Sequence, residues 1–363
     1  MAKQSAQCQD CSKAWGISEA NFPGNAPIEE KLKFLLGYAI LAPSGHNTQP
    51  WKFSIEKNAI KIFPDLTRRL AVVDSNHREL FISLGCAIEN LAIAARHFGL
   101  MPMVDSFPKG EEFILVSFST GKKDDSTLFR AITQRETNRK EFEAKKIPVQ
   151  AMEKILQLKP EKGITLTVLE ESQSTKVSEI IAEANSIQTD SRAFKQELIS
   201  WMRFNEKETE KSMDGLTMAS TGKGNVPGFI GRLFINLFFG SKARNKGDQA
   251  LIKHSAAFLL LSSEQDSKSS WAAAGQSLER ILLALALLGI KASFLNQACE
   301  EQKTKAKLQE FKAAKFPQIL MRIGYAESAG HSPRRPVEKS LFSHKKSLGK
   351  NCFAKPFFLK KNL

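Results

Sequence analysis

The spacing of apolar residues predicts that the ordered part of the chain opens with a helix followed by two strands. Over 28–40 the apolar positions recur on one helical face. Pro43 cannot continue this helix, because proline lacks a backbone donor and clashes with the preceding turn. Over 51–55 and 59–63 apolar and polar residues alternate, which predicts a hairpin that turns at Lys57 and Asn58.

A long helical pattern from Asp74 to Gly99 comes next, followed by a strand over 112–118. The chain then repeats this kind of order, starting with a helix after Pro148. Its further predicted elements are a strand over 164–169, a helical stretch over 177–201, a strand over 255–261, a helix over 274–290 and a strand over 316–325. Such a mixture is typical of an α+β fold.

The two long helical stretches resemble each other at an offset of 190 residues, which relates Gly85 to Gly275 and Gly99 to Gly289. The same offset relates Glu89 to Glu279. Two buried helices rich in leucine and alanine can share a pattern by chance. The shared glycines at both ends favour a duplication, so we expect two tandem repeats.

Residues 205–250 fit neither repeat. They contain several glycines and an apolar run over 229–240. Insertions of this length in a compact domain are usually functional or disordered, and the apolar content favours packing onto the rest of the molecule. We interpret the segment as a lid, with a dimer contact as the alternative. The expected organisation is an arm over 1–27, a first half over 28–130, a second half over 131–342 that includes this insertion, and a basic tail over 343–363.

The net charge of +15 is compatible with a nucleic-acid-binding protein, but its distribution argues against that class. The tail over 343–363 holds six lysines and no acidic residue, and no zinc-finger or RNA-binding signature is present. We therefore expect no nucleic-acid partner. The tail also interleaves phenylalanine with lysine. Contact with an anionic membrane or a partner is one interpretation, and a solvated terminus is the other.

Hydropathy and cysteine usage favour a cytoplasmic protein. No apolar run reaches the roughly 18 residues of a membrane span, and the polar start does not resemble a signal peptide. The five cysteines are few and odd in number, as in reduced proteins. Cys8 and Cys11 form a single CxxC pair, in which zinc would lack two ligands. A redox pair and a chance pair are the remaining interpretations.

The polar loop between the first helix and the first strand is the strongest candidate for chemistry. The histidines show no metal-binding spacing, and neither a nucleophile elbow nor a phosphate-binding P-loop occurs. The loop carries Pro43, Ser44, His46, Asn47 and Gln49. Their amide and hydroxyl groups can bind a planar ligand with polar edges. An ordinary helix-to-strand turn would also use proline, serine and asparagine.

The literal string of this loop resembles a known signature. Ala-Pro-Ser-Gly-His-Asn-Thr-Gln-Pro-Trp over 42–51 is similar to the Ala-Pro-Ser-x-x-Asn-x-Gln-Pro-Trp motif of the nitroreductase family of FMN enzymes. It looks most like the Acg branch of long single-chain members. The stretch over 132–142 resembles the arginine-rich start of the family, and 324–338 resembles its basic C-terminal segment. The resemblance covers 28–342.

The resemblance implies FMN as cofactor, with NADH or NADPH as co-substrate. Arginine forks suit the FMN phosphate, and hydroxyl and amide groups suit the pyrimidine edge of the flavin. The cofactor-binding residues that it implies are Pro43, Ser44, Asn47, Gln49, Arg135, Thr137, Arg139, Arg334 and Arg335. It assigns no metal and no catalytic side chain, because the flavin itself carries the hydride. For His46 a role in ordering the loop is the simpler interpretation.

The resemblance also implies a nitroreductase-like fold in which the two repeats form an intramolecular pseudo-dimer. Only the first half has the polar loop, and only the second has the arginine-rich start, while 158–163 stands where the second loop would be. One flavin site is therefore expected. We expect an FMN-dependent NAD(P)H oxidoreductase that passes hydride to a flat small-molecule acceptor, as a monomeric pseudo-dimer or a homodimer. The alternative is an FMN storage protein with a lid-covered flavin and little turnover.

Overall fold

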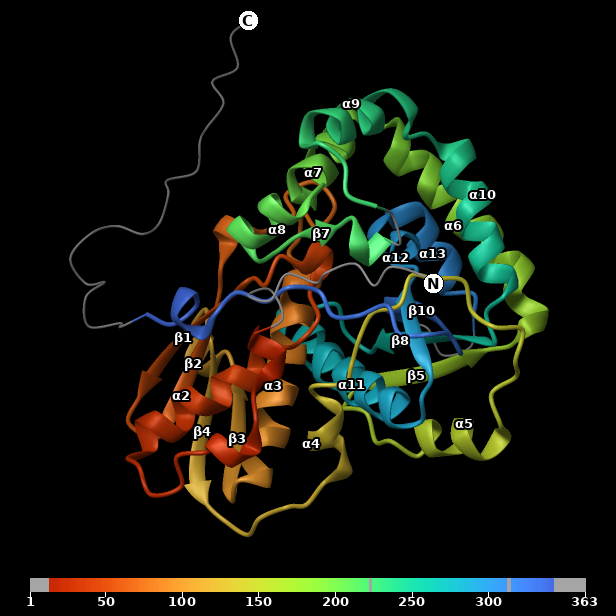
Figure 1. The fold of residues 1–363 in the computed structure, drawn as a ribbon. Helices are drawn as coiled ribbons and strands as arrows, with labels where there is room; N and C mark the ends of the chain where they lie inside the picture. The colour runs from red at the N-terminus through yellow and green to blue at the C-terminus, as the bar shows by residue number, and fades with distance from the viewer. Residues whose placement is uncertain (1–12, 222–223, 312–314, 343–363) are drawn as a thin grey trace, which may run out of the picture.

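Two four-stranded antiparallel sheets flank a central pair of long helices (Figure 1). The computed structural model describes residues 13–221, 224–311 and 315–342. The expected α+β class is confirmed, because helices and antiparallel sheets alternate through the chain. No helix within these described ranges is long and apolar enough to cross a membrane.

The first half builds one sheet around the predicted hairpin. Its elements are α2 (Ile28–Ala39), β1 (Trp51–Glu56), β2 (Ala59–Pro64), α3 (Arg78–His97), β3 (Leu100–Ser106), β4 (Ile114–Thr120) and α4 (Thr127–Ala131). The strand order is β1-β2-β4-β3. Lys57 occupies the turn with a φ of 55°, as a tight hairpin requires.

The second half repeats this topology with the insertion between its first two strands. Its elements are α5 (Val149–Leu156), β5 (Ile164–Leu169), α6 (Ser174–Asp190), α7 (Arg192–Trp201), β8 (Ala257–Ser263), α11 (Lys268–Leu287), β9 (Lys291–Phe294), α12 (Gln297–Glu300), α13 (Gln302–Leu308) and β10 (Phe316–Gly324). The strand order is β5-β8-β10-β9. In each half the long helix joins the second strand of that half to its third, as a duplication would produce.

The glycines related by the offset of 190 residues meet where α3 and α11 cross. A Cβ atom on Gly85 would lie 2.0 Å from the carbonyl oxygen of Ala272, and one on Gly275 would lie 2.0 Å from that of Ile82. Ile82 and Ala272 are themselves related by the same offset. The contact is therefore symmetric, and it leaves no room for a side chain at either glycine. Gly99 and Gly289 both have positive φ, 78° and 68°, just beyond the ends of the two helices.

The insertion forms a separate layer above the central helices (Figure 1). This layer starts just before the predicted bounds and ends just after them, with β6 (Met202–Arg203), α8 (Glu206–Ser212), β7 (Leu216–Thr217), α9 (Gly228–Phe238) and α10 (Ser241–Lys253). A small cluster of Phe204, Met218 and Ile235 holds it together. This cluster is distinct from the main core, which lies around α3 and α11.

Three sequence-based expectations about elements need correction. The helical stretch over 177–201 is two helices, because Ser191 is extended and its hydroxyl caps α7 at Phe194 N. The long first helix starts at Arg78, and Asp74 caps it by accepting from Glu79 N and Leu80 N. The arm is more than a surface segment, since Trp15 is buried. Cys8, Cys11 and the tail lie outside the described residues.

Candidate functional site

The polar loop holds three non-glycine residues in left-handed backbone conformations. His46, Asn47 and Gln49 have φ values of 45°, 54° and 51°. Such conformations persist only where surrounding contacts stabilise them, and they are frequent at ligand sites. Ser44 supplies two of those contacts. Its carbonyl accepts from Asn47 N at 2.9 Å, and its hydroxyl accepts from Gln49 N at 2.9 Å.

The loop is tied to the insertion and to the C-terminal segment at the same time. Asn47 donates its side-chain amide to the carbonyls of Gly215 and Pro333, both at 3.2 Å. Gln49 donates to the Met213 carbonyl at 2.8 Å, and its amide oxygen accepts from Arg335 N at 2.8 Å. The loop therefore joins segments that lie more than 160 positions away in the sequence.

Two buried arginines stand at the end of α2. Arg334 donates to the carbonyls of Leu41 at 3.1 Å and Ala42 at 3.0 Å, and to the Asn47 amide oxygen at 2.9 Å. Arg135 donates to the same Leu41 carbonyl at 2.8 Å. Burial, reinforced by the nearby charge of Arg135, lowers the pKa of Arg334 well below its usual value.

The arginine cluster has a fully buried carboxyl beside it and an aromatic cover. Glu279 on α11 is fully buried, and its Oε1 atom lies 3.3 Å from Arg135 Nε. Burial raises the pKa of Glu279 to about 7, although Arg135 and Arg334 act in the opposite direction. Trp15 lies 4.9 Å from the Arg334 guanidinium and stacks on His331. Glu279 is thus a carboxyl of weakened acidity next to two arginines, while Glu136, a second carboxyl that lines the small hollow, is engaged by Lys291 at 2.9 Å.

Two hollows open beside this cluster. The smaller, of ≈ 50 Å³, is lined by seven of the nine predicted cofactor residues: Pro43, Ser44, Asn47, Arg135, Thr137, Arg139 and Arg334. The larger, of ≈ 980 Å³, shares Pro43, Ser44 and Arg139 with it. Gln49 and Arg335 line neither hollow, because they support the loop from behind. The structure therefore brings most of the predicted residues together.

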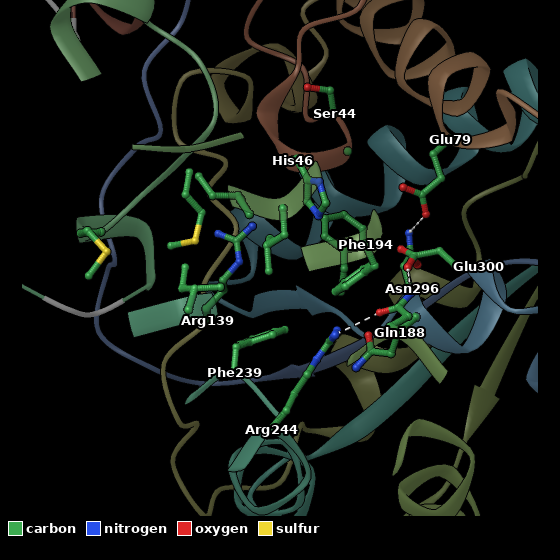
Figure 2. A pocket seen from close by; sticks show the side chains of 18 of the residues that line it. Ser44, His46, Glu79, Arg139, Gln188, Phe194, Phe239, Arg244, Asn296 and Glu300 are labelled. Atoms are coloured by element: carbon green, nitrogen blue, oxygen red, sulfur yellow. Dashed lines mark hydrogen bonds between the residues drawn. The ribbon is translucent and has the colours of Figure 1, made fainter. Parts of the chain in front are cut away.

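The large cavity has the size of a small-molecule site, about 300–1,000 Å³. Figure 2 shows Arg139 and His46 at one end and Glu79, Asn296 and Glu300 at the other. Apolar side chains line the space between them: Ile82, Phe194, Leu198, Met202, Phe204, Leu278 and Ile319. The small hollow can hold only a small group, so a ring system requires the large cavity.

The positive end of the large cavity has few partners of its own. Arg139 makes one long hydrogen bond, 3.5 Å to the Ser220 carbonyl. Arg244, which sequence reasoning missed, lies toward Gln188 and Glu300 (Figure 2), donates to Gln188 Oε1 at 3.0 Å and has the ring centroids of Phe194 and Phe239 at 5.7 and 5.8 Å. Burial, with the charges of Arg139 and Arg244, lowers the pKa of His46 to about 4. His46 is therefore neutral at pH 7.

A carboxyl pair forms the opposite end. Glu79 accepts from Asn296 Nδ2 at 3.0 Å, and Glu300 accepts from Gln188 Nε2 at 2.5 Å. Burial raises the pKa of both carboxyls, and for Glu79 the neighbouring Glu300 carboxylate raises it further. Each carboxyl is therefore less acidic than an ordinary glutamate. Arg78 does not reach the cavity; it pairs with Glu79 and donates to the Gln318 carbonyl.

The insertion roofs the large cavity. Leu216 and Met218 contribute from its start, and Ile230, Phe234 and Phe238 contribute from α9. The segment interpreted as a lid thus lines the candidate site.

Comparisons with known proteins agree with the resemblance found in the sequence. No family model matches the chain. A Mycobacterium tuberculosis protein with the name "Putative NAD(P)H nitroreductase Rv3131" is 24% identical over 338 residues, which is 90% of this chain and 95% of that protein. The "Probable NAD(P)H nitroreductase PigM" of Serratia sp. is 23% identical over 343 residues, which is 87% of this chain and 94% of that protein.

Among solved structures, the chain is similar to the FMN-dependent nitroreductase NfnB from Mycobacterium smegmatis in complex with NADPH, at 14% identity and a TM-score of 0.38. That similarity covers 58% of this chain and 95% of NfnB. The near-complete coverage of the two single-chain relatives confirms the expected resemblance to the nitroreductase family.

Proposed function

We propose that this chain, a relative of the NAD(P)H nitroreductases along 90% of its length, is an FMN-dependent oxidoreductase. It would take hydride from NADH or NADPH and pass it through FMN to a flat organic acceptor. The observation that carries the proposal is that a buried arginine cluster lies next to a large, mostly apolar cavity. Pro43, Ser44 and Arg139 line both the cavity and the small hollow at the cluster.

The residues present fit FMN in charge. The hydrogen bonds of Arg139 and Arg334 go to neutral oxygens, and Arg334 Nε has no hydrogen-bond partner among the described residues. Buried cations of this kind are costly without an anion nearby. A phosphate carries nearly two negative charges and binds arginine forks well. Arg139, Arg334 and the hydroxyl of Thr137 would hold it.

The residues also fit FMN in shape and polarity. The Ser44 hydroxyl lies at the junction of the two hollows and can donate to the flavin edge. Asn47 and Gln49 use their amides on protein partners, so their role is to hold the strained loop in place. When bound, FMN supplies two-electron redox chemistry.

The remaining cavity residues control water and protons. The apolar walls and the α9 side chains offer few hydrogen-bond partners to water in the space beside the loop. His46 is neutral at pH 7 and adds no charge there. At the far end the raised pKa values of Glu79 and Glu300 favour their protonated forms, which suits a carboxyl that gives a proton to an acceptor gaining electrons.

Turnover tests this proposal directly. The purified chain with FMN should oxidise NADH or NADPH when a nitroaromatic or quinone is added. Arg139→Ala should weaken FMN binding by about 2 kcal/mol, because a charge-assisted contact is lost. The matched control is Lys159→Ala, in the segment over 158–163, which should leave FMN affinity unchanged. Absence of turnover with both nicotinamides, despite bound FMN, would contradict the enzyme assignment.

The roof of α9 supports a second candidate function, FMN storage with little turnover. A covered flavin would be reduced by dithionite but not by nicotinamides. Phe234→Ala should then admit the nicotinamide, since Phe234 lines the cavity from α9. This variant is a cleaner probe than deletion of 210–240, which would also remove the Met213 and Gly215 carbonyls that hold the loop.

We further propose that the protein is cytoplasmic and that the two halves act as one intramolecular pseudo-dimer. The support for the pseudo-dimer is the shared strand order of the two sheets and the symmetric glycine contact between α3 and α11. The proposed boundary between the two halves lies between residues 130 and 131.

A further inference from the structure

Helix α9 carries an unusual concentration of exposed apolar side chains. Six large ones are 47–73% exposed on its 11 residues: Phe229, Ile230, Leu233, Phe234, Leu237 and Phe238. Contiguous apolar patches of this kind mark interaction sites on folded proteins. Figure 1 places α9 at the outer end of the insertion layer, away from both sheets.

These side chains form two adjacent stripes at helical spacing. The inner stripe, Ile230, Phe234 and Phe238, lines the large cavity. The outer stripe, Phe229, Leu233 and Leu237, lines neither of the two hollows described above, and its members are 73%, 57% and 66% exposed. Roofing the cavity accounts for the inner stripe alone, so the outer stripe requires another explanation.

Packing beneath α9 fixes which side faces outward. Ile235 is buried, and Gly231 fits so closely that a Cβ there would lie 2.1 Å from Phe204 Cδ1. On the third side, Arg232 pairs with Glu208 at 3.1 Å. The helix therefore cannot rotate to bury the outer stripe without losing these contacts.

The charges on α9 and α10 are mainly positive, whereas α8, which pairs with α9 through Glu208, exposes Glu206 and Glu210. Helices α9 and α10 together hold five basic residues and one acidic residue. Lys242 and Lys246 are exposed on α10, directly after α9. The acid, Asp248, is turned inward and accepts from Asn185 at 2.8 Å and Gln297 at 3.1 Å.

We propose that α9 docks on an anionic lipid surface, with the outer stripe among the acyl chains and Lys242 and Lys246 at the headgroups. A helix that is apolar on one side and flanked by lysines has the chemistry of an interfacial helix. A second copy of this chain fits less well. A two-fold contact through α9 would bring the lysines of both copies together without an exposed carboxylate on either helix.

Docking in this way also places the cavity mouth, with its inner stripe, against the lipid. This step rests on the proposed function, and it assigns a lipid-soluble acceptor such as a quinone to the site. The acceptor would enter from the bilayer through the inner stripe rather than from water.

Flotation with vesicles tests the docking without reference to turnover. The full chain should float with vesicles of phosphatidylcholine and phosphatidylglycerol at a ratio of about 7:3, and not with phosphatidylcholine alone. The triple variant Phe229→Ser, Leu233→Ser, Leu237→Ser should lose at least about tenfold in vesicle affinity. Lys242→Glu with Lys246→Glu should lose a comparable amount, and about 1 M salt should weaken the wild type.

The matched control replaces exposed apolar residues elsewhere, Met103→Ser with Val149→Ser, and should float like the wild type. A chain ending at 342 should also float, which excludes the basic tail as the cause. Unchanged flotation of the triple variant, or loss of flotation in the chain ending at 342, would overturn the proposal. So would absence of wild-type flotation together with a self-association that the triple variant abolishes.

Turnover assays test the entry of a lipid-soluble acceptor separately from the docking of α9. The triple variant should lose turnover with a quinone held in vesicles and keep it with a water-soluble acceptor. Equal loss or equal retention with both acceptors would overturn the lipid-soluble acceptor. A chain without any turnover would instead refute the proposed function, while the flotation result would still decide the docking.

Discussion

At the scale of single residues, the candidate site depends on groups held under unfavourable conditions. His46, Asn47 and Gln49 keep left-handed conformations because the loop is fixed by Ser44 and by distant carbonyls. Buried Arg334 has no hydrogen-bond partner at Nε within the described part of the chain. Such costs are usual where a ligand completes the environment. We therefore expect the apo-protein to gain considerable stability when FMN binds.

Glu279 makes stability depend on pH in a predictable direction. Burial raises its pKa in the folded state from 4.5 to about 7. Its contribution to stability is therefore complete below pH 4.5 and is lost as pH rises through 7. Between about pH 5 and 8 the free energy of unfolding of the wild type should fall by up to about 3 kcal/mol relative to that of Glu279→Gln, whose side chain stays neutral.

Urea denaturation of the two proteins at both pH values measures this difference. Glu338→Gln is the control, because Glu338 is largely exposed and should show no such change. If the difference between wild type and Glu279→Gln were constant across the pH range, Glu279 would have an ordinary acidity.

Sequence reasoning located the loop residues but not all of the side chains around them. Ser44, Asn47 and Arg135 belong to short stretches with a recognisable pattern. Trp15 and Arg244 do not, because each reaches the site only through tertiary packing. No spacing rule relates Trp15, in the arm, to Arg334, whose guanidinium it covers. The carboxyl pair of Glu79 and Glu300 was missed for the same reason.

At the scale of elements, the crossing of α3 and α11 controls the architecture. Both backbones approach at Gly85 and Gly275, where neither residue has space for a Cβ. The long helices were predicted because buried apolar positions recur over many turns. The edge strands β3 and β9 were missed. Strand β3 contains Pro102, which is tolerated because β3 lies at the edge of its sheet, and β9 is only four residues long.

Substitution at the crossing should be costly at either glycine. We expect Gly85→Ala and Gly275→Ala each to destabilise the protein by about 2–4 kcal/mol, since the added methyl group forces the helices apart. The double variant should be destabilised by less than the sum of the two single variants, because one separation of the helices relieves both clashes. Denaturant titration measures all three.

Gly247 offers the matched control for that series. It lies within α10, and a Cβ there would meet nothing within 4 Å. Gly247→Ala should stabilise the chain by roughly 0.5–1 kcal/mol through helix propensity alone. Destabilisation by Gly247→Ala as large as that by Gly85→Ala would show that close approach is not the cause.

At the scale of the whole molecule, two similar halves surround a single candidate site. The segment over 158–163, which stands where a second loop would be, is tied down by protein contacts. Arg280 donates to the Lys159 carbonyl and to Glu161, both at 2.7 Å, and Ser277 accepts from Glu161 N at 2.9 Å. The arginine of this region, Arg280, is paired with two carboxylates, those of Glu89 and Glu161.

Titration of apo-protein with FMN should therefore saturate at one FMN per chain. The physical reason is that the polar loop and the arginine-rich stretch occur once each and meet once. Isothermal calorimetry gives the ratio, with protein concentration determined by amino-acid analysis. A ratio of two would mean that the region around 158–163 also binds flavin.

The glycine contact has a final consequence for how the site responds to dilution. A site assembled from two separate subunits is lost when its subunits dissociate, so its occupancy depends on protein concentration. Here the helices that meet at Gly85 and Gly275 belong to one covalent chain. Their encounter is intramolecular, and the effective concentration of each half near the other is fixed by the linker between them. The site should thus remain assembled even at the few copies per cell at which a dissociable dimer would fall apart.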